Sequence, residues 1–134
     1  MTIRLLIAED HDLVREGLRA TFEGTEIDIV GEATTGSDAV QLASADGADV
    51  MLLDIKMPNS DGFEVLQQLQ STNKKLAILI YSQHERLDFQ VRARRLGASG
   101  YLTKQIRADE LVSAIREVGH GGSLWPQFRD DSPR

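Results

Sequence analysis

Five short apolar segments, separated by segments with helical periodicity, constrain the fold of this chain more than any other feature. The apolar segments are Ile3–Ala8, Ile27–Ala33, Val50–Leu53, Leu76–Ser82 and Gly100–Thr103. Each is nearly continuous in apolar residues, which is typical of strands that are covered on both faces. Strict alternation of strand and helix, repeated five times, predicts an α/β domain whose helices sandwich a doubly wound parallel sheet.

Apolar residues at helical spacing predict a helix after each strand. We expect helices over about 12–22 and 37–45, one opening at Asp61, one ending at Gly97 and one ending before Gly119. Asp61 suits the N-cap position, and Glu64 three residues later completes a capping-box pattern. Gly97 suits the position after the fourth helix, where a positive φ is common.

The length of the chain, 134 residues, fits one domain. We interpret residues 1–119 as that domain and 120–134, which lack periodicity, as a linker or tail.

A net charge of −6 argues against nucleic-acid binding by this chain alone. The chain has no cysteine, no apolar run near the roughly 18 residues that cross a membrane, and no signal-peptide pattern. We therefore expect a cytoplasmic protein without membrane contact.

Polar residues stand where four of the five strands end. They are Glu9 and Asp10 after the first strand, Asp54 after the third, Ser82 on the fourth and Lys104 after the fifth. Ligands of such sheets bind outside the carboxyl ends of the strands, and a strand order of 2-1-3-4-5 would make the first and third strands neighbours. An acid at a strand end is, taken alone, usually a helix cap or a solvated loop residue. The set of five is therefore the signal, and it predicts one site at this edge.

Three carboxylates within a few ångströms of one another repel strongly. Two unit charges about 4 Å apart interact by roughly 4 kcal/mol at an effective dielectric constant near 20. Either one carboxyl group holds a proton or a cation lies between them, and a site with only oxygen ligands favours hydrated Mg²⁺. With Lys104 and Ser82 nearby, such a site suits phosphoryl transfer to Asp54, which would act as the nucleophile.

Several motifs carry a resemblance to a known family. They are LIAEDH at residues 6–11, LLDIKMP at 52–58 followed by Asp61-Gly62, Tyr81-Ser82, and GASGYLTK at 97–104. Over about residues 3–119 the chain resembles the receiver domain of two-component response regulators. The last motif, together with AIREV at 114–118 and Gly121-Gly122, is most similar to the NarL/FixJ (LuxR-type) subgroup. The resemblance implies a flavodoxin-like (βα)5 fold with strand order 2-1-3-4-5.

The resemblance also implies roles for the metal-site residues. Asp54 would be phosphorylated by a sensor histidine kinase, which makes the kinase the expected partner. Asp10 would bind Mg²⁺ directly and Glu9 through water, while the backbone carbonyl of Lys56 would be a further ligand beside Asp54. The family more often has Asp at the position of Glu9, and the longer side chain keeps the charge while altering the geometry of the bound water.

The remaining implied roles concern switching and output. Lys104 would hold the phosphoryl group, Ser82 would move to donate a hydrogen bond to it, and Tyr101 would rotate inward. Members of the subgroup usually carry a C-terminal helix-turn-helix domain after a short linker. We therefore expect transcriptional output, DNA binding only through a domain absent from this chain, and possible homodimers.

Other interpretations stay open at the level of sequence. A stand-alone receiver would act by protein contacts or phosphorelay. A phosphohydrolase with an aspartyl-phosphate intermediate would want a second acid two residues after the nucleophile, where this chain has Lys56. The side chains of Lys56 and His84 either overhang the site or are solvated. For Trp125 and Phe128, three interpretations stay open: packing on the domain, on a neighbouring molecule or on a further domain.

Overall fold

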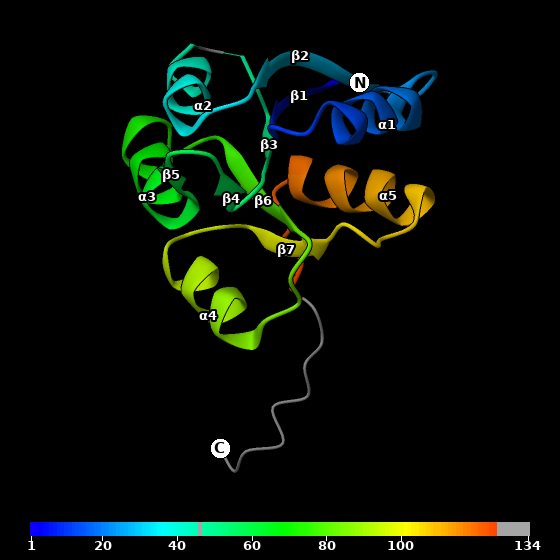
Figure 1. Cartoon of the computed structure of the whole chain (residues 1–134). Coiled ribbons are helices and arrows are strands. Elements are labelled where there is room, and N and C mark those ends of the chain that lie inside the picture. The colour runs from blue at the N-terminus through cyan, green and yellow to red at the C-terminus, as the bar shows by residue number, and fades with distance from the viewer. Residues whose placement is uncertain (46, 126–134) are drawn as a thin grey trace.

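The computed structural model describes residues 1–45 and 47–125 (Figure 1). Its strands are β1 (Ile3–Ala8), β2 (Ile27–Ala33), β3 (Val50–Leu53), β4 (Lys56–Met57), β5 (Ser60–Asp61), β6 (Ala77–Ser82) and β7 (Gly100–Thr103). Its helices are α1 (Asp12–Phe22), α2 (Gly36–Ala43), α3 (Gly62–Thr72), α4 (Leu87–Arg95) and α5 (Ala108–Gly119). Within the described ranges, no helix has the length and apolar character that crossing a membrane requires.

The main sheet has five parallel strands in the order β2-β1-β3-β6-β7. Counted without the short strands β4 and β5, this is the predicted order 2-1-3-4-5. The prediction of a doubly wound, flavodoxin-like sheet is therefore confirmed. The central strand β3 lies between β1 and β6, and this places its carboxyl end next to the end of β1.

Helices cover both faces of the sheet, as Figure 1 shows for α1 and α5 on one side and α2, α3 and α4 on the other. Successive residues of β3 point to opposite faces, as in any strand. Met51 and Leu53 pack into the core beneath α2, α3 and α4, whereas Val50 and Leu52 pack into the core beneath α1 and α5. Burial on both faces is why the strand segments are continuously apolar.

The ends of two helices follow the residues that the sequence marks. Asp61 is the N-cap of α3, and its Oδ1 accepts a hydrogen bond of 3.0 Å from the N–H of Phe63. Gly97 follows the end of α4 with a φ of 97°, a conformation that favours glycine. At Gly62, a Cβ atom would overlap with the backbone of Ile55, so the start of α3 requires glycine.

Two features were not predicted. One is an antiparallel hairpin directly after β3, in which Lys56 pairs with Asp61 around a turn at Asn59, whose φ is 57°. The other is the segment after α5, which returns to the sheet, where Leu124 forms a parallel bridge with Gly100 of β7. Trp125 packs on the core that α4 covers, and Phe128 lies outside the described residues. The assignment of 120–134 as a linker toward another domain stays a prediction.

Candidate functional site

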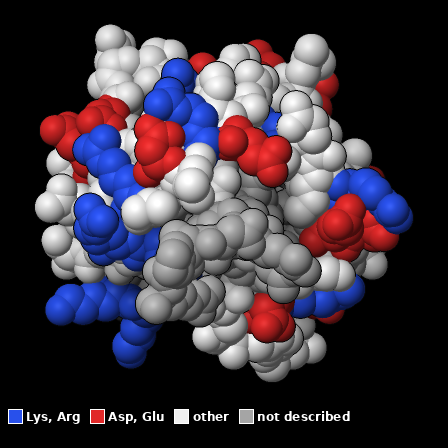
Figure 2. Space-filling view, turned by 90° about the horizontal axis from the view of Figure 1, so that it is seen from below, with Lys and Arg blue, Asp and Glu red and all other residues white. Residues whose placement is uncertain are grey.

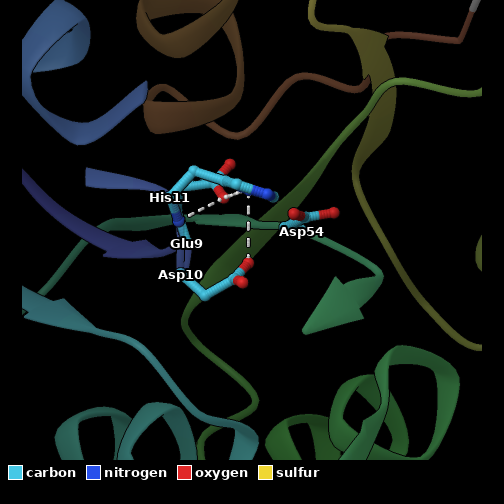
Figure 3. Close-up of side chains that lie close together, drawn as sticks. All are labelled: Glu9, Asp10, His11 and Asp54. Carbon is cyan, nitrogen blue, oxygen red and sulfur yellow. Dashed lines mark hydrogen bonds and ion pairs between the residues drawn. The ribbon is translucent and has the colours of Figure 1, made fainter. Parts of the chain in front are cut away.

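The carboxyl ends of β1 and β3 bring three acidic side chains together. The N–H of Glu9 donates to Ala33 O at 2.9 Å, and the N–H of Asp54 donates to Ala8 O at 3.0 Å. These bonds continue the sheet ladders by one residue, so the backbone of both acids is held by the sheet. Ligand atoms of Glu9, Asp10, His11 and Asp54 all lie within 4.8 Å of one another (Figure 3). The convergence predicted from the strand ends is therefore present.

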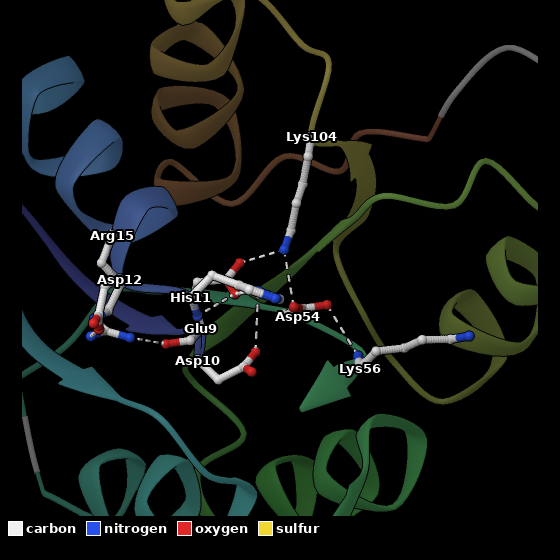
Figure 4. A network of polar contacts seen from close by, with 8 residues as sticks. All are labelled: Glu9, Asp10, His11, Asp12, Arg15, Asp54, Lys56 and Lys104. Carbon is white, nitrogen blue, oxygen red and sulfur yellow. Dashed lines mark hydrogen bonds and ion pairs between the residues drawn. The ribbon is translucent and has the colours of Figure 1, made fainter. Parts of the chain in front are cut away.

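Lys104 reaches this cluster from the end of β7 (Figure 4). Its Nζ lies 2.5 Å from Glu9 Oε1 and 3.0 Å from Asp54 Oδ2. The second carboxylate oxygen of Asp54 accepts a hydrogen bond of 3.0 Å from the N–H of Lys56. Glu9 and Asp54 are only 1% and 4% exposed, so these contacts are made largely out of contact with bulk water. One ammonium group thus bridges two buried carboxylates.

Burial and pairing act on these groups in opposite directions. Burial raises the pKa of Asp54 above its ordinary value, and the hydrogen bonds from Lys56 and Lys104 offset only part of this. Burial acts on Glu9 in the same sense, but the ammonium group of Lys104 and the hydrogen bonds from His11 hold the pKa of Glu9 below its ordinary value. Burial opposes the charge of Lys104, yet the two carboxylates raise its pKa. Lys104 is therefore held as a cation.

The cluster fits a divalent cation by charge and by donor type. Three carboxylates and one ammonium group leave two formal negative charges in excess. Among the described residues, Glu9 Oε1 and Asp10 Oδ1 are buried oxygens that accept no hydrogen bond of good geometry. Lys104 Nζ is near the first, and His11 Nδ1 lies 3.4 Å from the second. Oxygen donors of this kind are what Mg²⁺ selects, so the residues fit the metal that the sequence resemblance implies.

Two further residues support the cluster, and sequence reasoning did not assign them this role. His11 Nδ1 lies 2.9 Å from Glu9 Oε2, and this contact raises the pKa of His11. Arg15 donates from its guanidinium group to the backbone carbonyl of Glu9 at 2.8 Å and pairs with Asp12 (Figure 4). It also lies 3.3 Å from a carboxylate oxygen of Glu32. The i,i+3 spacing of Asp12 and Arg15 is visible in the sequence, but the contact with Glu9 depends on how the loop folds back.

Ser82 and Tyr101 lie on β6 and β7, the strands at the other side of β3. Ser82 Oγ accepts a hydrogen bond of 3.1 Å from the N–H of His84, and Tyr101 donates its hydroxyl to the carbonyl of His84. Tyr101 is 0% exposed, so its ring occupies the inward position in this structure. His84 therefore connects the two predicted switch residues through its backbone.

Lys56 meets the site through its backbone, while its side chain points away from Asp54 in Figure 4. Basic residues on and next to α4 make local contacts. The guanidinium carbon of Arg92 lies 4.3 Å from the centroid of the Phe63 ring, and Arg86, which precedes α4, pairs with Asp88 at 2.7 Å. Figure 2 shows Lys and Arg gathered on the side of this view where α4 lies. We assign no function to this basic surface.

A doubly wound parallel sheet that gathers three carboxylates and a lysine at its switch point defines a class of small α/β domains with an acidic edge that could bind a metal ion. Residues 5–116 match the family described as the response regulator receiver domain. The chain belongs to this family and is the receiver domain of a two-component response regulator of the NarL/FixJ type.

Similar proteins agree with this assignment. The response regulator UvrY of Escherichia coli is 37% identical over 120 residues, which cover 89% of this chain and 55% of UvrY. The transcriptional regulatory protein DegU of Brevibacillus brevis is 34% identical over 122 residues, 90% of this chain and 52% of DegU. A LuxR-family response regulator from Aurantimonas matches with a TM-score of 0.86 and 31% identity, covering 92% of this chain and 89% of that one. The chain spans about half the length of the curated relatives it matches.

Proposed function

We propose that Asp54 accepts a phosphoryl group from a sensor histidine kinase and that this modification switches the domain. The observation that carries the proposal is the position of Lys104, whose Nζ lies 3.0 Å from Asp54 and 2.5 Å from Glu9. A lysine that already bridges the nucleophile and an acid is placed to pair with an incoming phosphoryl oxygen. Asp54, Lys104 and Ser82 are accordingly the residues we assign to the chemistry.

In the proposed reaction, a carboxylate oxygen of Asp54 attacks phosphorus while the bond from phosphorus to the donor's imidazole nitrogen breaks. Bound Mg²⁺ would neutralise charge on the phosphoryl oxygens. Asp10, Glu9, Asp54 and the carbonyl of Lys56 would hold it. Lys104 would leave Glu9 to pair with an oxygen of the phosphoryl group.

After transfer, Ser82 would turn its hydroxyl from the N–H of His84 to a phosphoryl oxygen. Tyr101 would be favoured in the inward position that it has here, next to the carbonyl of His84. Phosphorylation of Asp54, which we call loading, would thus directly cause the changes at Ser82 and Tyr101. The domain assists its own phosphorylation in this scheme and turns over no separate substrate.

The test is phosphorylation by a small phosphodonor. We expect the chain to gain one acid-stable, base-labile phosphoryl group when it is incubated with acetyl phosphate and Mg²⁺, as read by intact mass. Asp54→Ala should gain none. A wild-type chain that stays unmodified, or an Asp54→Ala variant that gains the same group, would show that Asp54 is not the acceptor.

The output that we propose is regulation of transcription in the cytoplasm. The similarity to UvrY and DegU, which this chain covers over about half their length, supports a receiver joined to a further domain. DNA would be contacted by that domain, because this chain has a net charge of −6. Sequencing of the gene beyond the codon for Arg134 tests this directly, since a helix-turn-helix pattern should follow.

A homodimer of receivers is consistent with the proposal and would be seen by light scattering before and after phosphorylation of Asp54.

A further inference from the structure

The segment Ser123–Trp125, which we call the strap, lies along the open edge of the sheet. The N–H of Leu124 donates to Ser99 O at 2.7 Å, and the N–H of Tyr101 donates to Leu124 O at 3.2 Å. These bonds make a parallel bridge with Gly100, as a sixth strand would. An unpaired edge strand offers such donors and acceptors to any extended segment, and here the chain itself supplies the segment.

The strap is also anchored by side chains on both faces of the sheet. Leu124 packs on the core beneath α1 and α5, whereas Trp125 packs on the core beneath α4. Arg94 places its guanidinium carbon 5.7 Å from the centroid of the Trp125 ring. A Cβ atom at Gly100 would overlap with the carbonyl oxygen of Leu124, so docking at this distance requires glycine there.

Hydrogen bonds made by Tyr101 and by the backbone of His84 connect the strap to the candidate site. Leu124 O accepts from the N–H of Tyr101, whose hydroxyl donates to the carbonyl of His84. The N–H of His84 donates to Ser82 Oγ at 3.1 Å. Tyr101 and Trp125 also line the same groove, of about 370 Å³. The strap therefore contacts Tyr101, in its inward position, through the backbone, and Trp125 lines the groove that Tyr101 also lines.

We infer that docking of the strap on the β7 edge is coupled to the inward position of Tyr101, and that loading of Asp54 tightens the strap. The second part rests on the proposed function, because it takes the turn of Ser82 toward the phosphoryl group as its trigger. Coupling between two sites is reciprocal, so a docked strap also favours the loaded state. The strap immediately precedes residues 126–134, and its position is thus a means of passing the state of Asp54 along the chain.

The first experiment tests the coupling without any loading. Tyr101→Phe keeps the ring and removes only the hydroxyl that reaches His84. Loss of one such hydrogen bond should speed hydrogen exchange of the Leu124 amide roughly fivefold. The amide of Asp49, which donates to Arg4 O at 2.8 Å at the other end of the sheet, is the internal control. Equal exchange at Leu124 in the variant and the wild type would overturn the coupling.

The second experiment tests the response to loading, with Trp125 as the reporter because it is the only tryptophan of the chain. Acetyl phosphate with Mg²⁺ should lower acrylamide quenching of Trp125 about twofold, a change of the size expected for roughly 0.4 kcal/mol of tighter docking. Leu124→Pro removes the amide that donates to Ser99 and should abolish this response, whereas the exposed Ser123→Ala should keep it.

Intact mass separates the two ways in which this experiment would fail. A wild-type chain that gains the phosphoryl group and shows unchanged Trp125 quenching overturns the inference and leaves the proposed function standing. A wild-type chain that gains no phosphoryl group overturns the proposed function and, with it, the loading response of the strap. The exchange experiment on Tyr101→Phe still decides the coupling in that case.

Discussion

The two halves of the site edge are built from different interactions. At the ends of β1 and β3, buried carboxylates face one another around Lys104, and their geometry is held by charge. At the ends of β6 and β7, Ser82, His84 and Tyr101 are joined by hydrogen bonds between neutral groups. A buried charge is costly to leave unpaired, whereas a neutral hydroxyl can exchange one partner for another at a cost of about 1 kcal/mol. The first half therefore suits fixed chemistry, and the second suits movement.

The largest loss of stability is expected from Lys104→Met, in the charged half of the site. The substitution leaves Glu9 and Asp54 buried and facing each other, so the free energy of unfolding should fall by about 3 kcal/mol without metal. Added Mg²⁺ should restore part of the loss. Urea denaturation measures both, with Lys56→Met as the control, because that side chain points away from Asp54 (Figure 4). If the two variants were equally stable, the charged half would not depend on the bridge.

The assignment of Asp10 as a metal ligand predicts that substitutions at two adjacent residues change the affinity for Mg²⁺ very differently. Asp10→Asn removes a carboxylate whose Oδ1 lies buried in the cluster, and we expect the dissociation constant for Mg²⁺ to rise about a hundredfold. His11→Ala should change it far less, because the imidazole contacts Glu9 from an exposed position. Isothermal titration calorimetry compares the two, and equal effects would contradict the assignment of Asp10 as a ligand.

Arg15→Ala should have an intermediate effect on Mg²⁺ binding, since Arg15 contacts Glu9 through the backbone carbonyl and not through the carboxylate. We expect the dissociation constant for Mg²⁺ to rise about tenfold, as is common for residues that orient a metal ligand. The extent of phosphorylation at saturating Mg²⁺ should be unchanged.

Arg19→Ala is the matched control for this variant. Arg19 pairs with Glu32 at 2.6 Å, whereas Arg15 pairs with Glu32 at 3.3 Å. Among the described residues, only Arg15 of these two donates a hydrogen bond to the carbonyl of Glu9. A tenfold loss of Mg²⁺ affinity in Arg19→Ala as well would mean that the ion-pair network, and not the contact with Glu9, positions the metal site.

The smallest effect is expected from Tyr101→Phe, in the neutral half. Loss of the bond to His84 should lower the free energy of unfolding by about 1 kcal/mol, as measured by urea denaturation. Ser123→Ala, an exposed neighbour of Leu124, should stay within about 0.5 kcal/mol of the wild type. A loss near that of Lys104→Met would erase the difference between the two halves.

Sequence reasoning predicted the strands and the convergence of acids because both follow from patterns that a single chain displays. Burial on both faces makes β3 continuously apolar, and strand order then brings Asp54 beside Glu9. The hairpin of β4 and β5 escaped prediction because two-residue strands are too short to show a period of two. The return of Leu124 to Gly100 escaped it because pairing across the edge of a sheet leaves no local periodicity.

The contact between Gly62 and Ile55 has a consequence for how this family of sites can vary. The N–H of Gly62 donates to Ile55 O at 3.1 Å, so the residues between them form a closed loop that is fastened at its base. Asp54 immediately precedes this loop, and its N–H donates a separate hydrogen bond to Ala8 O. Substitutions at Pro58 or Asn59 would therefore change the turn of this loop while leaving Asp54 held by the sheet. The hydrogen bond at the base of the loop thus separates the backbone that positions Asp54 from the loop that follows it.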